Sequence, residues 1–455
     1  MPTRIPSVWR RYASTTFTAK SAPPKTHLHK RIPDSSFPKG YLLNGVHSGV
    51  KKDSSVLDLA VILSTSPRPT SAAACFTRNA FKAAPVLVSH DVLKRSAGRA
   101  RALVVNSGCA NAVTGKQGLE DAWAMAHATD ALLSPAPQDT SETLVMSTGV
   151  IGQTLPIAKI VSAIRGTSHA TLGSGFAAWE RAARAFMTTD TFPKLRARTF
   201  ALGAREFRIA GIDKGAGMIH PNMGPPHATL LGCVATDAAV KPRSLQSALT
   251  YAVERSFNAI SVDGDMSTND TIVAFANGAG AEDVLEEIDE GKDDGMFEAF
   301  RDELTRFMQE LAQLVVRDGE GATKFVTISV DGAASYADAH KVASKISTSA
   351  LVKTALYGED ANWGRVLAAT GSAELSTPLD PTRVSVSFIP TDGSKHLDLL
   401  VNGEPEIVDE ARASEILSAE DLEVRVQLGL GNESAKYWTC DFSYEYVRIN
   451  GDYRS

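Results

Sequence analysis

The sequence predicts a mixed α/β or α+β fold, in which helices pack on sheets of mixed strand direction. From about residue 37 onward, short apolar runs rich in β-branched residues alternate with longer stretches of helical periodicity. The chain has 455 residues, a length that predicts two or three domains or one large layered domain. Its composition, 43% hydrophobic and 22% charged, is that of a globular protein with a sizeable core.

The predicted strands are short apolar runs with turn-like flanks, and the predicted helices are longer stretches between them. Strands are expected at 57–63, 102–106, 207–212, 229–236, 271–276 and 325–330. Helices are expected at 118–133, 175–187, 242–257, 296–316 and 334–347. Pro242 opens its helix, where a missing N–H costs no intrahelical bond. The last segment, about 380–450, is predicted to be strand-rich in the runs 383-RVSVSFIP, 397-LDLLVNG, 423-EVRVQLGLG and 440-CDFSYEYVRIN.

Residues 1–33 differ in composition from the rest of the chain. They are rich in Arg, Lys, Ser and Thr, and the first acidic residue is Asp34. An Arg-rich, Ser-rich and acid-poor N-terminus is typical of an organelle transit peptide, and the lack of a long apolar segment argues against secretion. We therefore expect a mitochondrial transit peptide at 1–33, outside the fold, and a protein of the mitochondrial matrix. The alternative is a basic tail without a targeting role.

The charge balance and the cysteines exclude several classes of protein. The formal net charge of -5 does not favour nucleic acid or an anionic membrane as a partner. No apolar run approaches the roughly 20 residues that a membrane-spanning helix needs. The four cysteines lie far apart without a CxxC pair, so neither a zinc site nor a disulfide framework is expected.

Two polar runs are interpreted as structural. The run 263-DGDMSTND-270 resembles the start of a calcium loop, but it has Thr268 and Ala274 where glycine and glutamate are needed. We expect it to satisfy loop amides, with an ion held by a carboxylate pair as the alternative. The acidic run 282-EDVLEEIDEGKDDGM-296 is expected to be a solvated surface insertion.

Two residues are candidate nucleophiles. Cys109, in 104-VVNSGCANAVTG-115, has no assignable histidine to activate it and is expected to be a small buried thiol in a turn. Thr229, in 225-PPHATLLG-232, is the better candidate. A threonine that becomes the first residue of a polypeptide can use its own α-amino group as the base, and that group titrates near about 7.7–8.0.

The residues before Thr229 suit a cleavage. Ala228 is small and leaves the scissile carbonyl accessible, while Pro225 and Pro226 restrict the loop. The apolar run that follows would anchor the new N-terminus in a sheet. The alternative is that Thr229 only stands at the edge of a core strand that follows a surface loop.

This region resembles the ornithine acetyltransferase family of arginine biosynthesis, in KGAGMIHPNM at 214–223 followed by ATLLG at 228–232. Further matching blocks are 106-NSGCANAVTG, 147-STGVIGQTLP, 188-TTDTFPK, 262-VDGDMSTNDT, 318-DGEGATK, 358-GEDANWGR and 446-YVRINGDYRS. With the basic N-terminus, the chain is similar to the fungal mitochondrial members. One departure is the segment 224–227, because many members run directly from PNM into AT.

The resemblance implies a layered α/β/β/α sandwich similar to, but distinct from, that of the N-terminal-nucleophile hydrolases, with a smaller C-terminal α/β domain. It implies that the precursor cuts itself between Ala228 and Thr229 into an α chain, 34–228, and a β chain, 229–455. The two chains would stay together as a heterodimer, and heterodimers would pair into a heterotetramer.

The resemblance also implies the site. Thr229 would be the nucleophile, and Thr148 with Gly149 would form the oxyanion hole, since a Thr–Gly turn offers a hydroxyl and an unobstructed N–H. Substrate contacts are implied for Thr189, Lys214, Glu320, Asn450 and Ser455.

The implied reaction is a ping-pong acetyl transfer. Thr229 takes the acetyl group of N2-acetylornithine, ornithine leaves, and glutamate carries the group away as N-acetylglutamate. Some family members also accept acetyl-CoA as donor, and the sequence leaves that second activity open. No metal or redox cofactor is implied. The rival hypotheses are an amidohydrolase or aminopeptidase, in which water accepts the acyl group, and an uncleaved metabolite-binding protein.

Overall fold

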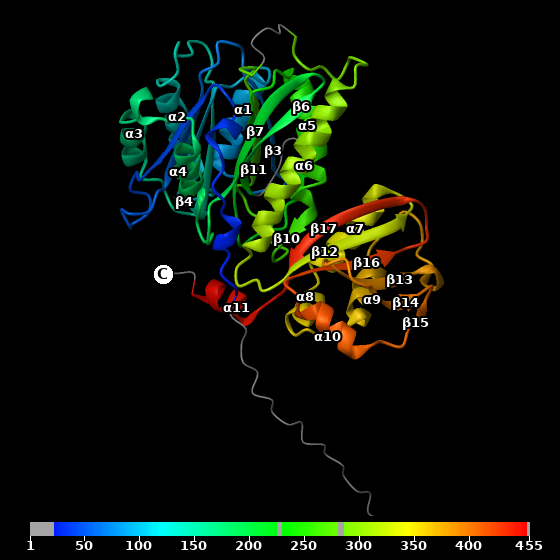
Figure 1. Cartoon of the computed structure of the whole chain (residues 1–455). Helices are drawn as coiled ribbons and strands as arrows, with labels where there is room; N and C mark the ends of the chain where they lie inside the picture. The colour runs from blue at the N-terminus through cyan, green and yellow to red at the C-terminus, as the bar shows by residue number, and fades with distance from the viewer. Residues whose placement is uncertain (1–21, 225–229, 281–285, 453–455) are drawn as a thin grey trace, which may run out of the picture.

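The computed structural model describes residues 22–224, 230–280 and 286–452. The described chain forms three sheets with helices packed on them. Two sheets belong to a larger body, at the top of Figure 1, and the third belongs to a smaller C-terminal part below it. The predicted mixed α/β class with a smaller C-terminal α/β domain is confirmed.

A four-stranded sheet in the larger body has the order β1-β2-β4-β5. Its strands are β1 (Tyr41–Val46), β2 (Leu59–Ser64), β4 (Ala102–Cys109) and β5 (Thr143–Val150). β4 and β5 run parallel, and the other pairs are antiparallel. β5 is an edge strand, but Ser89 on helix α1 (Ala84–Arg95) donates to the Val145 carbonyl and accepts from the Val145 N–H. The hydroxyl thus satisfies backbone groups that the open edge leaves unpaired.

A six-stranded sheet lies at the centre of the larger body, in the order β6-β7-β9-β11-β3-β8. Its strands are β6 (Lys194–Leu202), β7 (Arg205–Lys214), β9 (Leu231–Thr236), β11 (Thr271–Ala276), β3 (Ser71–Thr77) and β8 (Met223–Gly224). β9 and β11 are parallel and buried on both faces. Cys233 and Val273 join a core shared with the four-stranded sheet, whereas Val234 and Ile272 join the core under α5 and α6. Burial on both faces explains why these strands are continuous apolar runs in the sequence.

The helices of the larger body cover both sheets. Besides α1 they are α2 (Gly115–Asp130), α3 (Ile157–Arg165), α4 (Phe176–Phe186), α5 (Pro242–Glu254) and α6 (Met296–Arg317). α5 packs on β3 and α6 on β6 and β7, while α1 and α4 contact strands of both sheets.

The C-terminal part is built on a seven-stranded sheet with the order β10-β17-β12-β16-β13-β14-β15. Its strands are β10 (Ile260–Ser261), β17 (Glu433–Cys440), β12 (Phe325–Ala333), β16 (Asp421–Gln427), β13 (Ser385–Pro390), β14 (Leu397–Val401) and β15 (Glu404–Pro405). Its helices are α7 (Tyr336–Ser347), α8 (Ala350–Tyr357), α9 (Trp363–Gly371) and α10 (Glu410–Ser418). α7 packs on β12 and β17, and the short β10 joins this sheet to the larger body.

The predicted strands and helices are present with shifted ends, and β11 matches its predicted range. Thr229, at the start of the predicted strand 229–236, lies outside the described residues, and β9 begins at Leu231. The strands that were not predicted are β1, β3, β5, β6, β8, β10, β15 and β17. β3 reads SAAACFT, and its alanines have little β-propensity, so its pairing with β11 rather than its local sequence makes it a strand.

The strand expected in 440-CDFSYEYVRIN is wrong. β17 ends at Cys440, and helix α11 spans Tyr444–Gly451. The Ser443 hydroxyl caps this helix by accepting from the N–H of Tyr446 at 3.2 Å. The alternating aromatic residues imitate the pattern of a half-buried strand. No residue of the helix is buried, so this pattern does not reflect packing against a core, and the N-cap at Ser443 favours the helix.

The expectation that all of 1–33 lies outside the fold is wrong for its last residues. Lys25 pairs with Glu420 at 2.5 Å, and Ile32 is 8% exposed within the hydrophobic core. The fold therefore begins before residue 33. Residues 1–21 lie outside the described residues, and the transit peptide stays a prediction.

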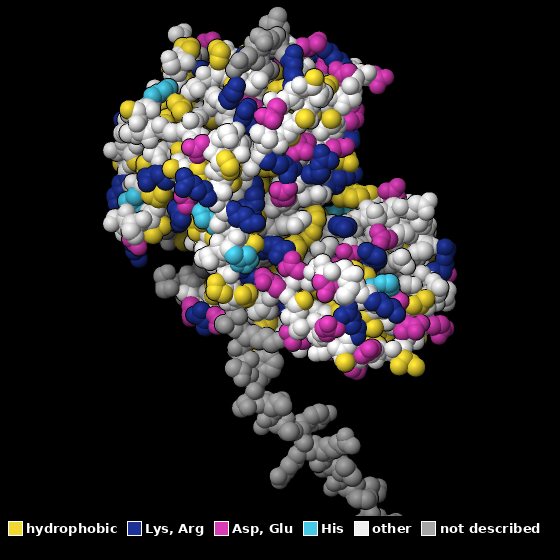
Figure 2. All heavy atoms as spheres, viewed as in Figure 1, with side chains coloured by type: hydrophobic (Ala, Val, Ile, Leu, Met, Phe, Trp, Pro, Cys, Tyr) yellow, Lys and Arg dark blue, Asp and Glu magenta, His cyan; other side chains and the backbone are white. Residues whose placement is uncertain are grey.

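The surface carries both signs of charge in close mixture (Figure 2). In the described part of the acidic run, Glu287 pairs with Arg99 at 2.8 Å and Asp289 pairs with Lys241, so the run is tied to the surface by ion pairs. No helix among the described residues is long and apolar enough to cross a membrane. All four cysteines are buried and free.

Candidate active site

A cavity of about 350 Å³ opens where the ends of β5, β7 and β9 meet the C-terminal helix α11. Its size lies in the range typical of small-ligand sites. Among its lining residues are Thr148, Gly149, Thr189, Lys214, Glu320 and Asn450, from five separated sequence blocks. The structure thus brings together the described residues that the sequence predicts for the site. Ala228, Thr229 and Ser455 lie outside the described residues.

Thr148 and Gly149 stand at the end of β5, where a β-bulge against β4 shifts the pairing. Gly149 has a φ of +128°, and a Cβ there would lie 2.3 Å from the carbonyl carbon of Gly108. Only glycine fits this close approach of two backbones. The bulge ends the regular pairing of β4 and β5 beside the cavity. Bulges next to active sites commonly change the direction of the neighbouring side chains.

Lys214 ends β7 and reaches across to Thr148, with 3.3 Å between its Nζ and the Thr148 Oγ1. Burial lowers the pKa of Lys214, and the Asp190 carboxylate opposes this effect. Since the ammonium group donates to Oγ1, the hydrogen of the Thr148 hydroxyl is free to point elsewhere. This arrangement suits a hydroxyl that must donate into the cavity.

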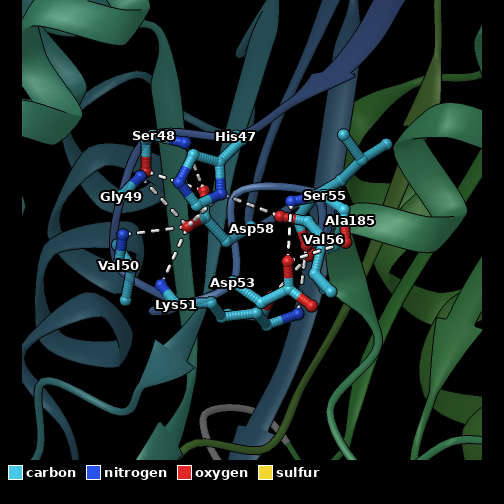
Figure 3. A network of polar contacts seen from close by, with 12 residues as sticks. His47, Ser48, Gly49, Val50, Lys51, Asp53, Ser55, Val56, Asp58 and Ala185 are labelled. Carbon is cyan, nitrogen blue, oxygen red and sulfur yellow. Dashed lines mark hydrogen bonds and ion pairs between the residues drawn. The ribbon is translucent and has the colours of Figure 1, made fainter.

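Thr189 lies on the loop between α4 and β6, and this loop is held from one side by Lys51. The Lys51 Nζ donates to the carbonyls of Leu57, at 3.0 Å, and Met187, at 2.7 Å. The loop that carries Lys51 is fixed by Asp58, whose carboxylate accepts from the backbone N–H groups of residues 48–51 (Figure 3). Met187 is two residues from Thr189, so the network limits where Thr189 can move.

A buried ion triad holds the same loop from the other side. Lys194 is fully buried and pairs with Asp190 at 2.5 Å and Asp318 at 2.6 Å. Asp190 also accepts from the N–H of Gly215 at 2.7 Å, and Asp318 accepts from that of Thr191 at 2.9 Å. Burial alone would raise the pKa of Asp190, but Lys194 and Lys214 outweigh it, and the pKa is lowered. The triad joins the Thr189 loop to the chain that follows Lys214.

Glu320 and Asn450 close the cavity from the C-terminal side. The Asn450 Nδ2 donates to the Glu320 Oε2 at 2.7 Å, and the Glu320 N–H donates to the Ala216 carbonyl at 2.8 Å. A Cβ on Gly217 would lie 2.5 Å from the Glu320 carboxylate, so the glycine makes room for it. Glu320 is 8% exposed.

The run 263–270 satisfies backbone amides, as the sequence predicts. Asp263 accepts from the N–H groups of Met218 and Ile219, at 2.6 and 2.8 Å, and from the Tyr446 hydroxyl at 3.1 Å. It therefore fixes both the cavity wall and helix α11. No group of His, Cys, Asp and Glu side chains suited to a metal ion occurs among the described residues.

Asn269 and Asp270 end this run and also line the cavity, but sequence reasoning missed both. The Asn269 Nδ2 donates to the carbonyls of Ala110 and Ser147. Burial raises the pKa of Asp270 well above its ordinary value, against the opposing charge of Lys214. The available signal was a pair of polar residues at the start of a buried strand.

Cys109 does not reach the cavity lining and fits the predicted buried thiol. It is 3% exposed, and its Sγ donates to the Gln153 carbonyl at 3.2 Å. Burial raises the pKa of the thiol, which lowers the fraction present as the reactive thiolate.

Similarity to a known protein family extends over nearly the whole chain. The model of the ArgJ family matches residues 42–455. The chain belongs to the ArgJ family. It is 71% identical to the mitochondrial arginine biosynthesis bifunctional protein ArgJ of Postia placenta, over 100% of both chains. It is 67% identical to the protein of the same name from Laccaria bicolor, over 98% of this chain and 99% of that one.

Two solved structures are also similar to this chain. One is the arginine biosynthesis bifunctional protein argJ of Bacillus halodurans, at 37% identity and a TM-score of 0.43, over 47% of this chain and 95% of that chain. Another is the ornithine acetyltransferase of Mycobacterium tuberculosis complexed with ornithine, at 36% identity and a TM-score of 0.36, over 42% of this chain and 96% of that chain.

Proposed function

We propose that this ArgJ chain is the acyltransferase of arginine biosynthesis that moves an acetyl group from N2-acetylornithine to glutamate. One observation carries the proposal: residues from separated blocks, predicted as an oxyanion hole and as substrate contacts, line a single cavity. Its close relatives are named arginine biosynthesis bifunctional proteins, which supports the same pathway.

The nucleophile of the proposed reaction is Thr229, with its own α-amine as the base after cleavage of the Ala228–Thr229 bond. Leu230, the next residue, lines the cavity. The Thr229 oxygen attacks the acetyl carbon, and the oxyanion is stabilised by the Thr148 hydroxyl and the Gly149 N–H. The α-amine passes the proton to the departing amine of ornithine.

Substrate recognition follows from the charges around the cavity. Lys214 supplies the positive charge for a substrate carboxylate, and Glu320 supplies the negative charge for a substrate ammonium. Asn450 bonds one oxygen of Glu320 and fixes the carboxylate in place. Because ornithine and glutamate are both α-amino acids, one site can serve both half-reactions. Thr189 and Ser455 complete the proposed contacts.

The assembly and the location of the protein are proposed as well. The α and β chains remain associated after cleavage, heterodimers pair into a heterotetramer, and the enzyme works in the mitochondrial matrix. Its close relatives carry the word mitochondrial in their names, which supports this location. Acetyl-CoA is proposed as an alternative acetyl donor, and no metal or redox cofactor takes part.

Intact mass of the purified protein beside a Thr229→Ala variant tests the nucleophile. We expect the native protein to give two fragments, one that ends at Ala228 and one that begins at Thr229. The variant should give one unbroken chain. The native protein is then given acetylornithine with and without glutamate. Glutamate-dependent N-acetylglutamate supports acetyl transfer, whereas release of acetate at the same rate without glutamate would identify a hydrolase. A parallel assay with acetyl-CoA and glutamate tests the second donor.

A further inference from the structure

Lys51 does not line the candidate cavity, yet it contacts the backbone behind two of the cavity walls. One wall is the end of β5, with Thr148 and Gly149, and the other is the loop that carries Thr188 and Thr189. Lys51 stands in the loop between β1 and β2, far from both walls in the sequence. A single side chain that reaches both walls can fix their separation.

The ammonium group of Lys51 reaches the second wall through a hydrogen bond. Its Nζ donates to the Met187 carbonyl at 2.7 Å, one residue before Thr188. It also donates to the Leu57 carbonyl at 3.0 Å, within its own loop. Both acceptors are backbone groups, so the lysine is the only side chain that this link requires.

The aliphatic part of Lys51 packs behind the first wall. A Cβ on Gly108 would lie 3.1 Å from the Lys51 Cγ and 3.1 Å from the Val50 Cγ1, so these two side chains fill the space beside the glycine. Gly108 pairs with Gly149, and a Cβ on Gly149 would lie 2.3 Å from the Gly108 carbonyl carbon. Because protein interiors are close-packed, a shift of Gly108 is passed on to Gly149. The lysine stem therefore supports the N–H that is proposed for the oxyanion hole.

Asp58 fixes the point from which the Lys51 side chain starts. Its buried carboxylate accepts from the N–H of Lys51 at 2.9 Å and from those of the three preceding residues (Figure 3). The Asp58 carbonyl accepts from the N–H of Ser107 at 2.9 Å, directly before Gly108. The loop is thus tied to the same strand end that the lysine stem supports.

We propose that Lys51 is a positioning residue that sets the distance between the oxyanion hole and the Thr189 loop, an inference that rests on the proposed function. The two parts of its side chain have separate tasks. The ammonium holds a loop whose substrate contact is made both before and in the transition state. The stem supports the Gly149 N–H, which is needed once the oxyanion forms. Loss of the ammonium should therefore raise KM, whereas loss of the stem should also lower kcat.

Two substitutions separate these tasks. Lys51→Met keeps most of the stem without the donor, and Lys51→Ala removes both. At saturating glutamate, we expect KM for acetylornithine to rise about 10-fold in both variants. The value of kcat should stay within about 2-fold of the native one in Lys51→Met and fall about 10-fold in Lys51→Ala.

Lys341 provides matched controls away from the cavity. Its Nζ also donates to a backbone carbonyl, that of Glu374, at 3.2 Å, and neither residue lines the candidate cavity. Lys341→Met and Lys341→Ala should keep the native KM and kcat. An effect that comes only from losing a lysine–carbonyl bond or a lysine stem would appear in both pairs of variants.

Hydrogen exchange follows the two walls in the absence of substrate. The reporters in the loop are the N–H groups of Thr188 and Thr191, which donate to Asp190 and Asp318. In Lys51→Met these amides should exchange at least about 5-fold faster than in the native protein, while those of the β5 end keep their native rate. In Lys51→Ala both walls should exchange faster. Mass spectrometry of peptic fragments measures these rates.

Three results would overturn the inference. An unchanged KM in Lys51→Met shows that the ammonium does not position the loop, and this variant decides even where Lys51→Ala fails to fold. An equal fall of kcat in Lys51→Met and Lys51→Ala shows that the stem has no task of its own. If the native protein transfers no acetyl group, the proposed function fails and the inference fails with it, a result that differs from the first two because no variant is involved.

Discussion

Asn269 holds the strand end that carries Thr148, with 2.8 Å between its Nδ2 and the carbonyl oxygen of Ser147. The same Nδ2 donates to the Ala110 carbonyl, so one amide joins β5 to the loop after β4. The proposed oxyanion hole begins one residue beyond Ser147. Its position therefore depends on a side chain from a distant part of the sequence.

Asn269→Ala is expected to lower kcat about 10-fold, the effect of about 1.4 kcal/mol, and to leave KM within about 2-fold. The loss arises because Thr148 and Gly149 are no longer held where the oxyanion forms. Steady-state kinetics with acetylornithine and glutamate measure both constants.

Asn277→Ala is the control, because the Asn277 Nδ2 also donates to two backbone carbonyls, those of Lys39 and Gly40, away from the cavity. Both variants should lose about 1–3 kcal/mol of unfolding free energy in urea, but only Asn269→Ala should lose kcat. Equal kcat values for Asn269→Ala and Asn277→Ala would refute the role of Asn269 in positioning the oxyanion hole.

Gly149→Ala is expected to reduce stability and activity together. Its new methyl group would lie 2.3 Å from the Gly108 carbonyl carbon at a φ of +128°, so one of the two backbones must shift. We expect a fall in kcat of about 10²–10³-fold, as for the loss of an oxyanion donor. Gly152→Ala is the control, since its φ is also positive, +80°, but no atom lies within 4 Å of the new Cβ. It should cost about 1–2 kcal/mol of stability and leave kcat near the native value.

Lys194→Met is expected to destabilise the fold by about 3–5 kcal/mol, because it leaves Asp190 and Asp318 buried without their cation. Urea unfolding at pH 7 measures the loss. Lys353→Met is the control for burying a lysine-sized apolar chain, since Lys353 is 1% exposed and its ammonium bonds the neutral Thr439 hydroxyl and Cys440 carbonyl. A loss no larger in Lys194→Met than in Lys353→Met would contradict the prediction.

The deficit of Lys194→Met should depend on pH. Burial raises the pKa of Asp190, but Lys194 and Lys214 outweigh it, so the folded pKa lies below the unfolded value of about 3.9. A lowered carboxyl pKa contributes stability above the unfolded pKa, and that stability is lost as pH falls toward the folded pKa. The stability difference between the native protein and Lys194→Met is thus expected to shrink below about pH 4. Unfolding curves from about pH 3 to 7 test this, with Lys353→Met expected to keep a constant difference.

Asn450→Asp is expected to weaken substrate binding rather than folding. It places a second carboxylate 2.7 Å from the Glu320 Oε2, where like charges repel and displace the group proposed to meet the substrate ammonium. We expect KM for acetylornithine to rise about 10-fold, equal to about 1.4 kcal/mol. Val447→Ala, on the same helix at a position 70% exposed, should leave KM unchanged. An unchanged KM in Asn450→Asp would show that Asn450 on helix α11 takes no part in substrate binding.

The elements that the sequence predicted well are those whose local pattern is sufficient. β11 is a buried run that includes β-branched and aromatic residues, α5 and α6 carry helical periodicity, and Pro242 marks the start of α5. β3 was missed because its alanines form a strand only beside β11. Helix α11 was mistaken for a strand because its alternating aromatic residues imitate a strand pattern and outweighed the local N-cap signal of Ser443, which bonds the N–H of Tyr446.

The sequence by itself determined the family blocks and the residue types for the chemistry: a threonine–glycine pair, a lysine, a glutamate and a C-terminal asparagine. Only the tertiary structure decided that these residues share one cavity, because the contacts that bring them together join positions far apart in the chain, such as Asn450 and Glu320. It also decided the supporting residues. Asn269 and Lys194 are buried and bond groups that lie far away in the chain, such as Ser147 and Asp318, and neither the burial nor these partners is written in the local sequence.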